Sequence, residues 1–318
     1  MLSLYKELSY HTKGLSHILI LKDGRLSSSS ADNTLIIYNK ESFQPDLIFR
    51  EHTDYVNYHI QLRNENIVTC SWDNTLKIIK LLPKNKYEVI QTLKEHKNVI
   101  DKAIELEDGR LLTCSDDQTV IMWKKNKNNL FEVEKKIITS ENDYPNTNIV
   151  LINENILLCS SVSDEDLKFF DIKNDLKYMF CFKNVQCCFS RNSILYIEEK
   201  DLLIVGGINF KGIYLFKLKK IPQLIGNFFQ DIIDSVYSII LFGNDNILVG
   251  LEEKQDDYVV DSIYQFKIDK DNKKLININK KSQAHAELIN GVINWKDKNF
   301  IVSCSKDRKV KIWTMNNK

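Results

Sequence analysis

The chain has 318 residues, of which 43% are hydrophobic and 27% are charged, so it is long enough to bury a substantial core. Its 44 lysines and arginines nearly balance 43 aspartates and glutamates, for a formal net charge of +1. This balance argues against a nucleic-acid-binding protein, which normally carries a basic stripe. No apolar run approaches the roughly 18 residues that a membrane helix needs, and the scattered charges of the first residues argue against a signal peptide.

The cysteines indicate the compartment. There are seven, an odd number, and no Cys-x-x-Cys pair occurs, which suits a reducing compartment better than a disulfide framework. We therefore expect an intracellular, cytoplasmic protein. Cys70, Cys114 and Cys304 each lie directly before a serine on an apolar strand, where a buried small hydrophobe is the common role. We expect no metal and no other cofactor.

In chain order, the first expected elements are short strands joined by tight turns. The stretch "HILILKDGRLSSSS" (17–30) has strand patterns on both sides of an Asp-Gly turn, and "NTLIIY" (33–38) supplies the next strand. "PDLIFREH" (45–52) is the fourth. "IQLRNENIVTCS" (60–71) and "IELEDGRLLTCS" (104–115) repeat the first arrangement. The pattern predicts four antiparallel strands per roughly 40–45 residues, with no amphipathic helix of convincing length, which is typical of a propeller.

A repeat is visible in the spacing of aspartate, serine and histidine. Four segments align: "SSSSADNTLIIYNK", "VTCSWDNTLKIIKL", "LTCSDDQTVIMWKK" and "VSCSKDRKVKIWTM" (27–40, 68–81, 112–125 and 302–315). Each has an aspartate, a serine two residues before it and a large residue six residues after it: Asp32, Ser30 and Tyr38; Asp73, Ser71 and Ile79; Asp117, Ser115 and Trp123; Asp307, Ser305 and Trp313. A histidine precedes each aspartate by 21 or 22 residues: His11, His52, His96 and His285. Four of the six histidines share this phase, which indicates a structural repeat.

On these motifs the chain resembles the WD40-repeat β-propellers. The resemblance implies an all-β fold, a seven-bladed WD40-type β-propeller of four-stranded antiparallel blades, in a single domain over residues 1–318. The blade cores are expected at about 14–50, 55–92, 99–137, 147–182, 188–229, 235–278 and 289–315. The middle three rest on strand alternation and not on the motif, so a count of six blades stays open.

The two ends of the sequence suggest how the last blade is completed. The segment "VKIWTMNNK" (310–318) leaves no residues for an outer strand of that blade. "LYKELSYH" (4–11) ends in His11 as "VIQTLKEH" (89–96) ends in His96, so it resembles an outer strand without a blade before it. We expect residues 3–9 to complete the last blade and close the ring, because an open propeller would leave two unpaired edges.

The resemblance also implies what the repeated polar residues do. In the family they form a hydrogen-bonded chain from Trp to Ser, His and Asp that ties neighbouring strands together. Two complete structural tetrads are expected: His96, Ser115, Asp117 and Trp123, and His285, Ser305, Asp307 and Trp313. Two partial tetrads are expected, one with Tyr38 and one with Ile79 in place of Trp: His11, Ser30 and Asp32, and His52, Ser71 and Asp73. The fourth to sixth blades lack the network. A catalytic triad would occur once, so four copies favour a structural role, and no catalytic residue is expected.

The dipeptide Trp72-Asp73 looks like the pair that names the family. The alignment places that pair at the end of the third strand, where this blade has Ile79-Lys80. Trp72 is instead the residue before the turn aspartate, and the resemblance implies that this position faces the partner-binding rim, with residues at the start of each first strand. The partner-binding candidates are Trp72, Tyr55, Asn57, Asp101, Asp116, Asn290 and Lys306.

The sequence therefore favours a non-catalytic protein–protein interaction scaffold that binds a peptide or domain on the upper propeller face, over blades seven, one, two and three. We expect protein partners and a monomer within a larger complex, with no nucleic acid, membrane or small-molecule substrate. One alternative is a substrate receptor of a cullin-type ubiquitin ligase, which typically carries Trp-Asp-x-Arg at the end of the third strand; the fourth blade has Lys173 in place of that Arg. The other is an enzyme using the central channel, for which the innermost strands offer only His59 and Glu105.

Overall fold

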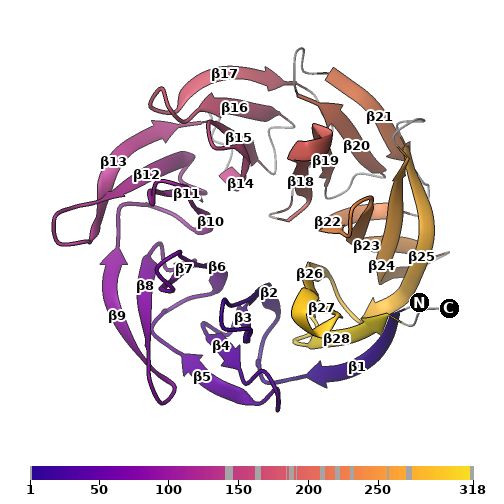
Figure 1. Ribbon diagram of the computed structural model, residues 1–318, viewed down its shortest axis with the longest axis horizontal. Coiled ribbons are helices and arrows are strands. Elements are labelled where there is room, and N and C mark those ends of the chain that lie inside the picture. Colours follow the sequence, from indigo (N-terminus) through magenta and orange to yellow (C-terminus); the bar gives the residue numbers. More distant parts are fainter. Residues whose placement is uncertain are drawn as a thin grey trace. The chain divides into compact units, whose positions relative to one another are not determined.

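The computed structural model describes the chain in eleven stretches: 2–139, 146–161, 166–183, 185, 190, 192–207, 212–218, 223–229, 233–255, 258–269 and 274–315. Within these stretches the strands form seven four-stranded antiparallel sheets (Figure 1). The only helical elements among the described residues are two 3₁₀ turns, η1 (Glu198–Lys200) and η2 (Lys296–Lys298). No helix in the described part of the chain is long and apolar enough to cross a membrane. The chain forms two compact units, residues 10–185, and residues 1–9 with 186–318.

Residues 10–185 contain four sheets, each with its strands in chain order. The first consists of β2 (Leu15–Ile20), β3 (Leu26–Ser30), β4 (Leu35–Tyr38) and β5 (Pro45–Phe49). The second consists of β6 (Val56–Gln61), β7 (Ile67–Ser71), β8 (Leu76–Leu82) and β9 (Lys86–Leu93). The third consists of β10 (Ile100–Glu105), β11 (Leu111–Ser115), β12 (Thr119–Lys125) and β13 (Phe131–Ile138). The fourth consists of β14 (Asn146–Asn153), β15 (Ile156–Ser161), β16 (Leu167–Asp171) and β17 (Lys177–Phe182).

The other unit contains the remaining three sheets that the structure describes. The fifth consists of β18 (Ile194–Ile197), β19 (Leu202–Gly206), β20 (Gly212–Lys217) and β21 (Gln223–Phe229). The sixth consists of β22 (Ile233–Phe242), β23 (Asn246–Gln255), β24 (Tyr258–Asp269) and β25 (Lys274–His285), and β25 runs past the expected blade limit at 278. The seventh consists of β26 (Ile289–Trp295), β27 (Phe300–Ser305), β28 (Val310–Met315) and the N-terminal β1 (Leu2–Leu8).

The seventh sheet contains the predicted pairing of the two ends of the sequence. β1 runs antiparallel to β28, with Leu2 opposite Met315 and Leu8 opposite Val310. Leu2 and Leu8 are buried, and Glu7 forms an ion pair with Lys309 at 2.7 Å. The fold class is therefore confirmed: seven antiparallel four-stranded blades, the last of them completed by the N-terminal strand. The expected single domain over residues 1–318 stays a prediction.

The turns follow from residues that tolerate a left-handed backbone. Gly24 and Gly109, which follow aspartates between the first and second strands of their sheets, have φ of 83° and 86°. The turn between the second and third strands also needs one left-handed residue. This residue directly follows the repeated aspartate in four sheets: Asn33, Asn74, Gln118 and Arg308, with φ of 69°, 64°, 67° and 70°. The same turn therefore recurs in the four sheets that carry the full repeat.

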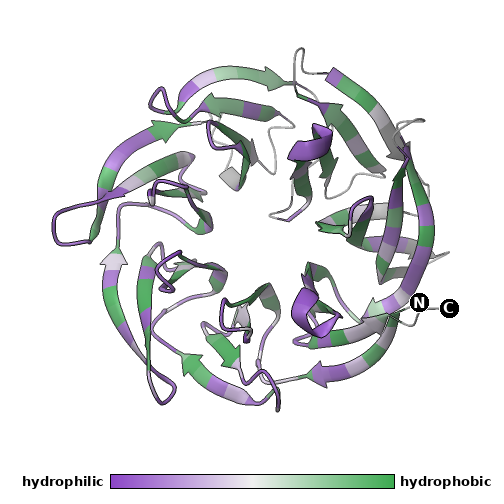
Figure 2. Ribbon diagram, in the orientation of Figure 1, coloured by the Kyte–Doolittle hydropathy of each residue, from purple (hydrophilic) through white to green (hydrophobic). Residues whose placement is uncertain are grey.

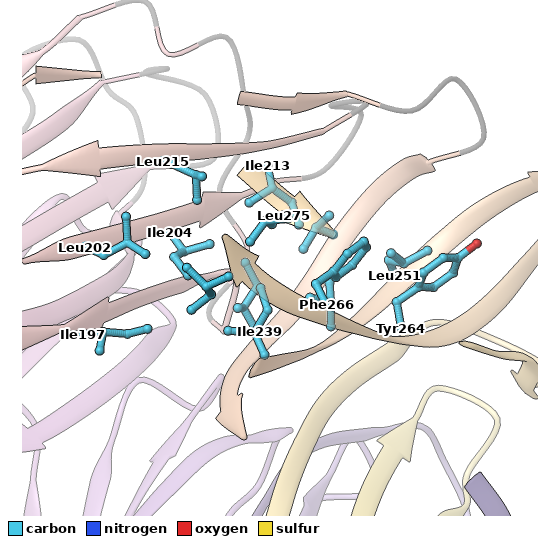
Figure 3. Packing of buried hydrophobic residues seen from close by; sticks show 14 residues of the cluster. Ile197, Leu202, Ile204, Ile213, Leu215, Ile239, Leu251, Tyr264, Phe266 and Leu275 are labelled. Atoms are coloured by element: carbon cyan, nitrogen blue, oxygen red, sulfur yellow. The ribbon is translucent and has the colours of Figure 1, made fainter. Parts of the chain in front are cut away.

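The core lies between the faces of consecutive sheets. In one such layer, Ile204 and Ile213 of the fifth sheet pack in one cluster with Phe266 of the sixth (Figure 3). Figure 2 shows hydrophobic colours alternating with hydrophilic ones along most strands, while η1 and η2 are hydrophilic. Inner strands such as β7, β11 and β19 are buried along their whole length, and apolar residues packed between neighbouring sheets explain why sheets without the repeat motif still form.

Candidate functional site

The third and seventh sheets each contain one buried polar chain. In the third, His96 Nδ1 lies 3.1 Å from Asp117, and His96 Nε2 lies 2.8 Å from the hydroxyl of Thr113. The Trp123 indole donates to the same hydroxyl at 2.9 Å. The seventh sheet repeats this arrangement at 2.8 Å for all three contacts, with His285, Asp307, Ser303 and Trp313.

The hydroxyl in this chain is not the one expected from the sequence. Ser115 donates to the carbonyl of Asn98 at 3.1 Å and accepts from the amide of Asp117 at 3.0 Å, so it shapes the turn and does not contact the histidine. Ser305 does the same with Glu287 and Asp307. The expectation was wrong by two residues because residues two apart on a strand share one face, and spacing alone does not decide between them. The decisive signal was a second hydroxyl four residues before each aspartate: Ser28, Thr69, Thr113 and Ser303.

The first and second sheets contain altered versions of this buried polar chain. His11 lies 2.9 Å from Asp32 and 2.8 Å from Ser28, and the Tyr38 phenol lies 2.8 Å from the same Ser28 hydroxyl, so tyrosine fills the place of tryptophan. Here Ser28 again stands where Ser30 was expected.

In the second sheet, His52 lies 2.7 Å from both Asp73 and Thr69. Thr69 stands where Ser71 was expected. Ile79 pairs with Ile67 in the register that Trp123 and Leu111 have in the third sheet. It therefore occupies the tryptophan position without a donor.

The charges of these chains are set by burial and hydrogen bonding. Burial by itself would raise the pKa of Asp73, but hydrogen bonds from His52, Thr75 and the amide of Thr53, with the charge of His52, lower that pKa far below its ordinary value. Burial also lowers the pKa of His285 against the opposing effect of Asp307, so this imidazole is neutral near pH 7. A neutral imidazole donates from Nδ1 to the aspartate and accepts at Nε2 from the hydroxyl.

These chains resemble a Ser–His–Asp catalytic triad in composition, but their hydroxyl groups are not accessible to a substrate. Thr113 and Ser303 have no solvent-exposed surface. A nucleophile must be reached by its substrate, so a fully buried hydroxyl cannot serve as one. The chains instead satisfy buried polar groups and tie the strands together.

The sixth sheet has a different polar network at a position where the sequence analysis expected none. Lys280 Nζ lies 2.6 Å from Glu253 Oε1, and Ser262 donates to Glu253 Oε2 at 3.0 Å. The Lys280 ammonium also lies 5.4 Å from the centre of the Tyr264 ring. This network could not be found from the residue pattern, because the lysine and the glutamate come from strands that no repeat phase relates.

Among the predicted surface positions, Trp72 and Tyr55 form an aromatic pair. Trp72 is 41% exposed and Tyr55 is half-buried, with ring centres 4.7 Å apart and planes at 31°. The amide of Trp72 donates to the carbonyl of Tyr55 at 3.0 Å, which fixes the two backbones together. The Lys13 ammonium lies 5.4 Å from the centre of the Tyr55 ring, within the range of a cation–π contact.

The same backbone contact recurs at the equivalent positions of other sheets. The amide of Asp116 donates to Val99 at 2.9 Å, and that of Lys306 to Leu288 at 3.0 Å. Asp116 is half-buried and Lys306 is exposed. Asn290 is half-buried, and its carbonyl accepts from the Asn192 side chain at 3.0 Å.

Two expected surface residues are buried instead. Asn57 and Asp101 are 2% and 1% exposed, and Asn57 Nδ2 donates to Asp101 Oδ1 at 2.9 Å. Both occupy the extra position of a β-bulge at the start of the first strand, between Val56 and Tyr58 and between Ile100 and Lys102. The bulge turns these side chains between neighbouring sheets.

The first strands of the sheets in residues 10–185 do not carry a convergent acid–base pair. His59 is fully buried, lies 2.8 Å from Ser27, and has a pKa lowered to about 3 by burial and by the charge of His11. Glu105 accepts from the amide of Arg63 at 2.7 Å. These contacts give neither residue the geometry of a shared active site.

A row of polar contacts on these strands was missed in the sequence. The rings of His17 and Tyr58 are 3.9 Å apart, the Lys102 ammonium lies 5.6 Å from the Tyr58 ring, and it also donates to Asn148 at 2.8 Å. His17, Tyr58 and Lys102 each follow the repeated histidine by six residues, a phase that could have been found. Lys102 and Asn148 are buried, so the row holds four first strands together.

The family model "WD domain, G-beta repeat" matches residues 43–80, 87–124 and 277–314. Each match ends at the third strand of a blade, where the structure has β8, β12 and β28. The chain is a WD40-repeat β-propeller. No curated protein matches it. WD40 propellers generally serve as protein-interaction scaffolds.

Proposed function

We propose that this WD40 propeller is a non-catalytic scaffold that binds a peptide or a domain of another protein through the surface formed by Trp72 and Tyr55. The observation that carries the proposal is the aromatic pair. An indole exposed by 41% and packed at a tilt against a second ring presents apolar surface to solvent next to the Lys13 cation. Exposed aromatic residues held in place by their backbone are typical anchors of protein interfaces.

The surroundings support recognition rather than catalysis. Asp116, on the third sheet, occupies the register position of Trp72 and adds a half-buried carboxylate to the same rim. The hydroxyls that bond the repeated histidines are fully buried: Ser28, Thr69, Thr113 and Ser303. The proposal includes a cytoplasmic location, since the five cysteines that the structure describes are all free thiols, and a monomeric chain within a larger complex.

The test compares partners captured from the native cell by wild-type protein and by the double variant Trp72→Ala, Tyr55→Ala, with mass spectrometry as the readout. Removing two anchors of this kind lowers recovery of a bound partner by at least about tenfold. Tyr178→Ala is the matched control, because Tyr178 is 53% exposed on the outer strand β17, away from this rim. Equal recovery by wild type and double variant, with both folded by circular dichroism, contradicts the proposal.

A further inference from the structure

The sixth sheet places two carboxylates directly opposite each other. Glu252 on β23 and Asp261 on β24 are register partners, so their side chains share one face of the sheet. Like charges at this position destabilise a sheet unless something compensates for them. The Tyr237 hydroxyl on β22 donates to Glu252 Oε2 at 3.1 Å, so a phenol joins the pair.

Asp261 has unsatisfied hydrogen-bonding capacity. Its residue surface is 6% exposed, and its Oδ1 has no hydrogen-bond partner among the described residues. The amide of Ile289 donates to this carboxyl. Buried polar atoms in native proteins are nearly always partnered, so an acceptor left open beside a second carboxylate indicates a missing donor.

The electrostatics of the site agree with a missing cation. Burial, then the charge of Glu252, raise the pKa of Asp261 to about 7, against the effect of the Ile289 amide, and Asp307 and Glu287 raise it further. The titratable groups that face it are Glu252 on β23, Tyr237 on β22 and His285, its register partner on β25. Glu287, between β25 and β26, and Asp307, between β27 and β28, also act on it. His285 is itself bonded to Asp307.

The site lies at the register position that Trp72 occupies in the second sheet. Glu252 follows Leu251, the register partner of Val236, which lies directly before a β-bulge of β22. Trp72 follows Ser71, the register partner of Val56, in the same way. Glu252 therefore holds the place in the sixth sheet that Trp72 holds in the second.

We propose that Glu252, Asp261 and Tyr237 form a binding site for the side chain of an arginine from a protein partner. A guanidinium is planar and carries five donors, so it can bridge two facing carboxylates and the phenol oxygen at once. A metal ion fits less well, because no group of three or more metal-ligating side chains occurs in the described part of the chain. The proposal is independent of the aromatic pair of Trp72 and Tyr55.

The experiment titrates full-length protein with the blocked peptide Gly-Gly-Arg-Gly-Gly and with the same peptide carrying citrulline, the neutral isostere of arginine, by calorimetry or NMR. The arginine peptide binds at least about tenfold more tightly than the citrulline peptide, as expected for charge-assisted hydrogen bonds. The double variant Glu252→Gln, Asp261→Asn loses this preference. Binding is weaker at pH 6 than at pH 8, because Asp261 must give up its proton to pair with the guanidinium.

Two controls separate this site from a general acidic surface and from the aromatic pair. Glu199→Gln removes an exposed carboxylate on η1 and leaves arginine binding unchanged. The Trp72→Ala, Tyr55→Ala variant also retains arginine binding, so failure of the proposed scaffold surface would not remove this signal.

A stability measurement separates a ligand site from a structural network. Asp261→Asn raises the melting temperature of the free protein, because it removes a buried charge whose Oδ1 has no donor among the described residues, whereas loss of a structural group would lower it. Equal affinity for both peptides, arginine binding that survives the double variant, or Ca²⁺ binding at these carboxylates without arginine binding each overturn the proposal.

Discussion

The third sheet allows the energy of one hydrogen-bonded chain to be measured against a natural control. The Thr113 hydroxyl joins two buried groups, the His96 imidazole and the Trp123 indole. Thr69 occupies the same place in the second sheet, where it meets His52 but has Ile79 in place of tryptophan. Valine is nearly isosteric with threonine, so Thr113→Val and Thr69→Val remove the hydroxyl from each site with little change in volume.

The two substitutions leave different numbers of polar groups without a partner. A buried donor or acceptor that loses its partner costs about 1–3 kcal/mol. Thr113→Val orphans the indole N–H and the imidazole Nε2, so it should destabilise the protein by about 2–6 kcal/mol. Thr69→Val orphans only the imidazole of His52 and should cost about 1–3 kcal/mol. The difference, about 1–3 kcal/mol, reports the contribution of the indole donor.

Urea denaturation followed by far-ultraviolet circular dichroism measures the free energy of unfolding of both variants. The comparison holds when the variants have the same dependence of this free energy on urea concentration (m-value). Thr113→Ser keeps the hydroxyl and serves as the rescue control, since Ser303 fills this role naturally in the seventh sheet. Equal losses for the two valine variants would refute the assignment of the indole contact. A loss for Thr113→Ser as large as that for Thr113→Val would refute the importance of the hydroxyl itself.

Two further predictions concern the whole chain. Deleting residues 1–9 removes β1, loses the burial of Leu2 and Leu8 at about 2 kcal/mol each, and exposes β28 as an edge strand. The truncated protein should therefore melt at a lower temperature and less cooperatively than the full chain. Unchanged cooperative melting counts against this prediction. The pKa values of Asp32, Asp73, Asp117 and Asp307 are lowered on folding, so their stabilisation is complete above the unfolded pKa near 4 and is lost as the pH falls through the folded values. The urea midpoint should therefore fall as the pH is lowered from about 5 to 3, and a midpoint independent of pH over that range would contradict the role of these carboxylates.

The strand content could be read from the sequence because it depends on local patterns, and these patterns favoured seven blades while leaving six open. Apolar strand patterns, alternating in outer strands and continuous in buried ones such as β19, are local, and they persist in the fifth and sixth sheets, where the repeated residues are absent. The pairing of β1 with β28 also followed from local reasoning, because a blade without an outer strand and an outer strand without a blade complete each other.

The details that the sequence left undetermined depend on which way a side chain points. Ser115 and Thr113 share one face of β11, so only the three-dimensional register shows which hydroxyl meets His96. Asn57 and Asp101 were expected at the surface because their positions flank the rim. The β-bulge that buries them leaves no mark in the residue pattern.

The site of Glu252 and Asp261 was missed for a related reason. The two residues are nine positions apart on a hairpin whose length differs from that of the other blades, so the repeat phase does not bring them together. Only the pairing of β23 with β24 shows that they face each other.

The pairing of β1 with β28 also sets an order of events during synthesis. Leu2 and Met315 are register partners separated by 313 residues. At about 5–20 residues per second, β1 leaves the ribosome roughly 15–60 s before the strand it pairs with. During that interval the N-terminal strand has no sheet to join, and a chain that stops before β28 never acquires one. A nascent chain therefore differs from a finished one in that its N-terminal strand is unpaired. Ribosome-bound truncations of increasing length should bind a chaperone that captures β-strands until β28 emerges.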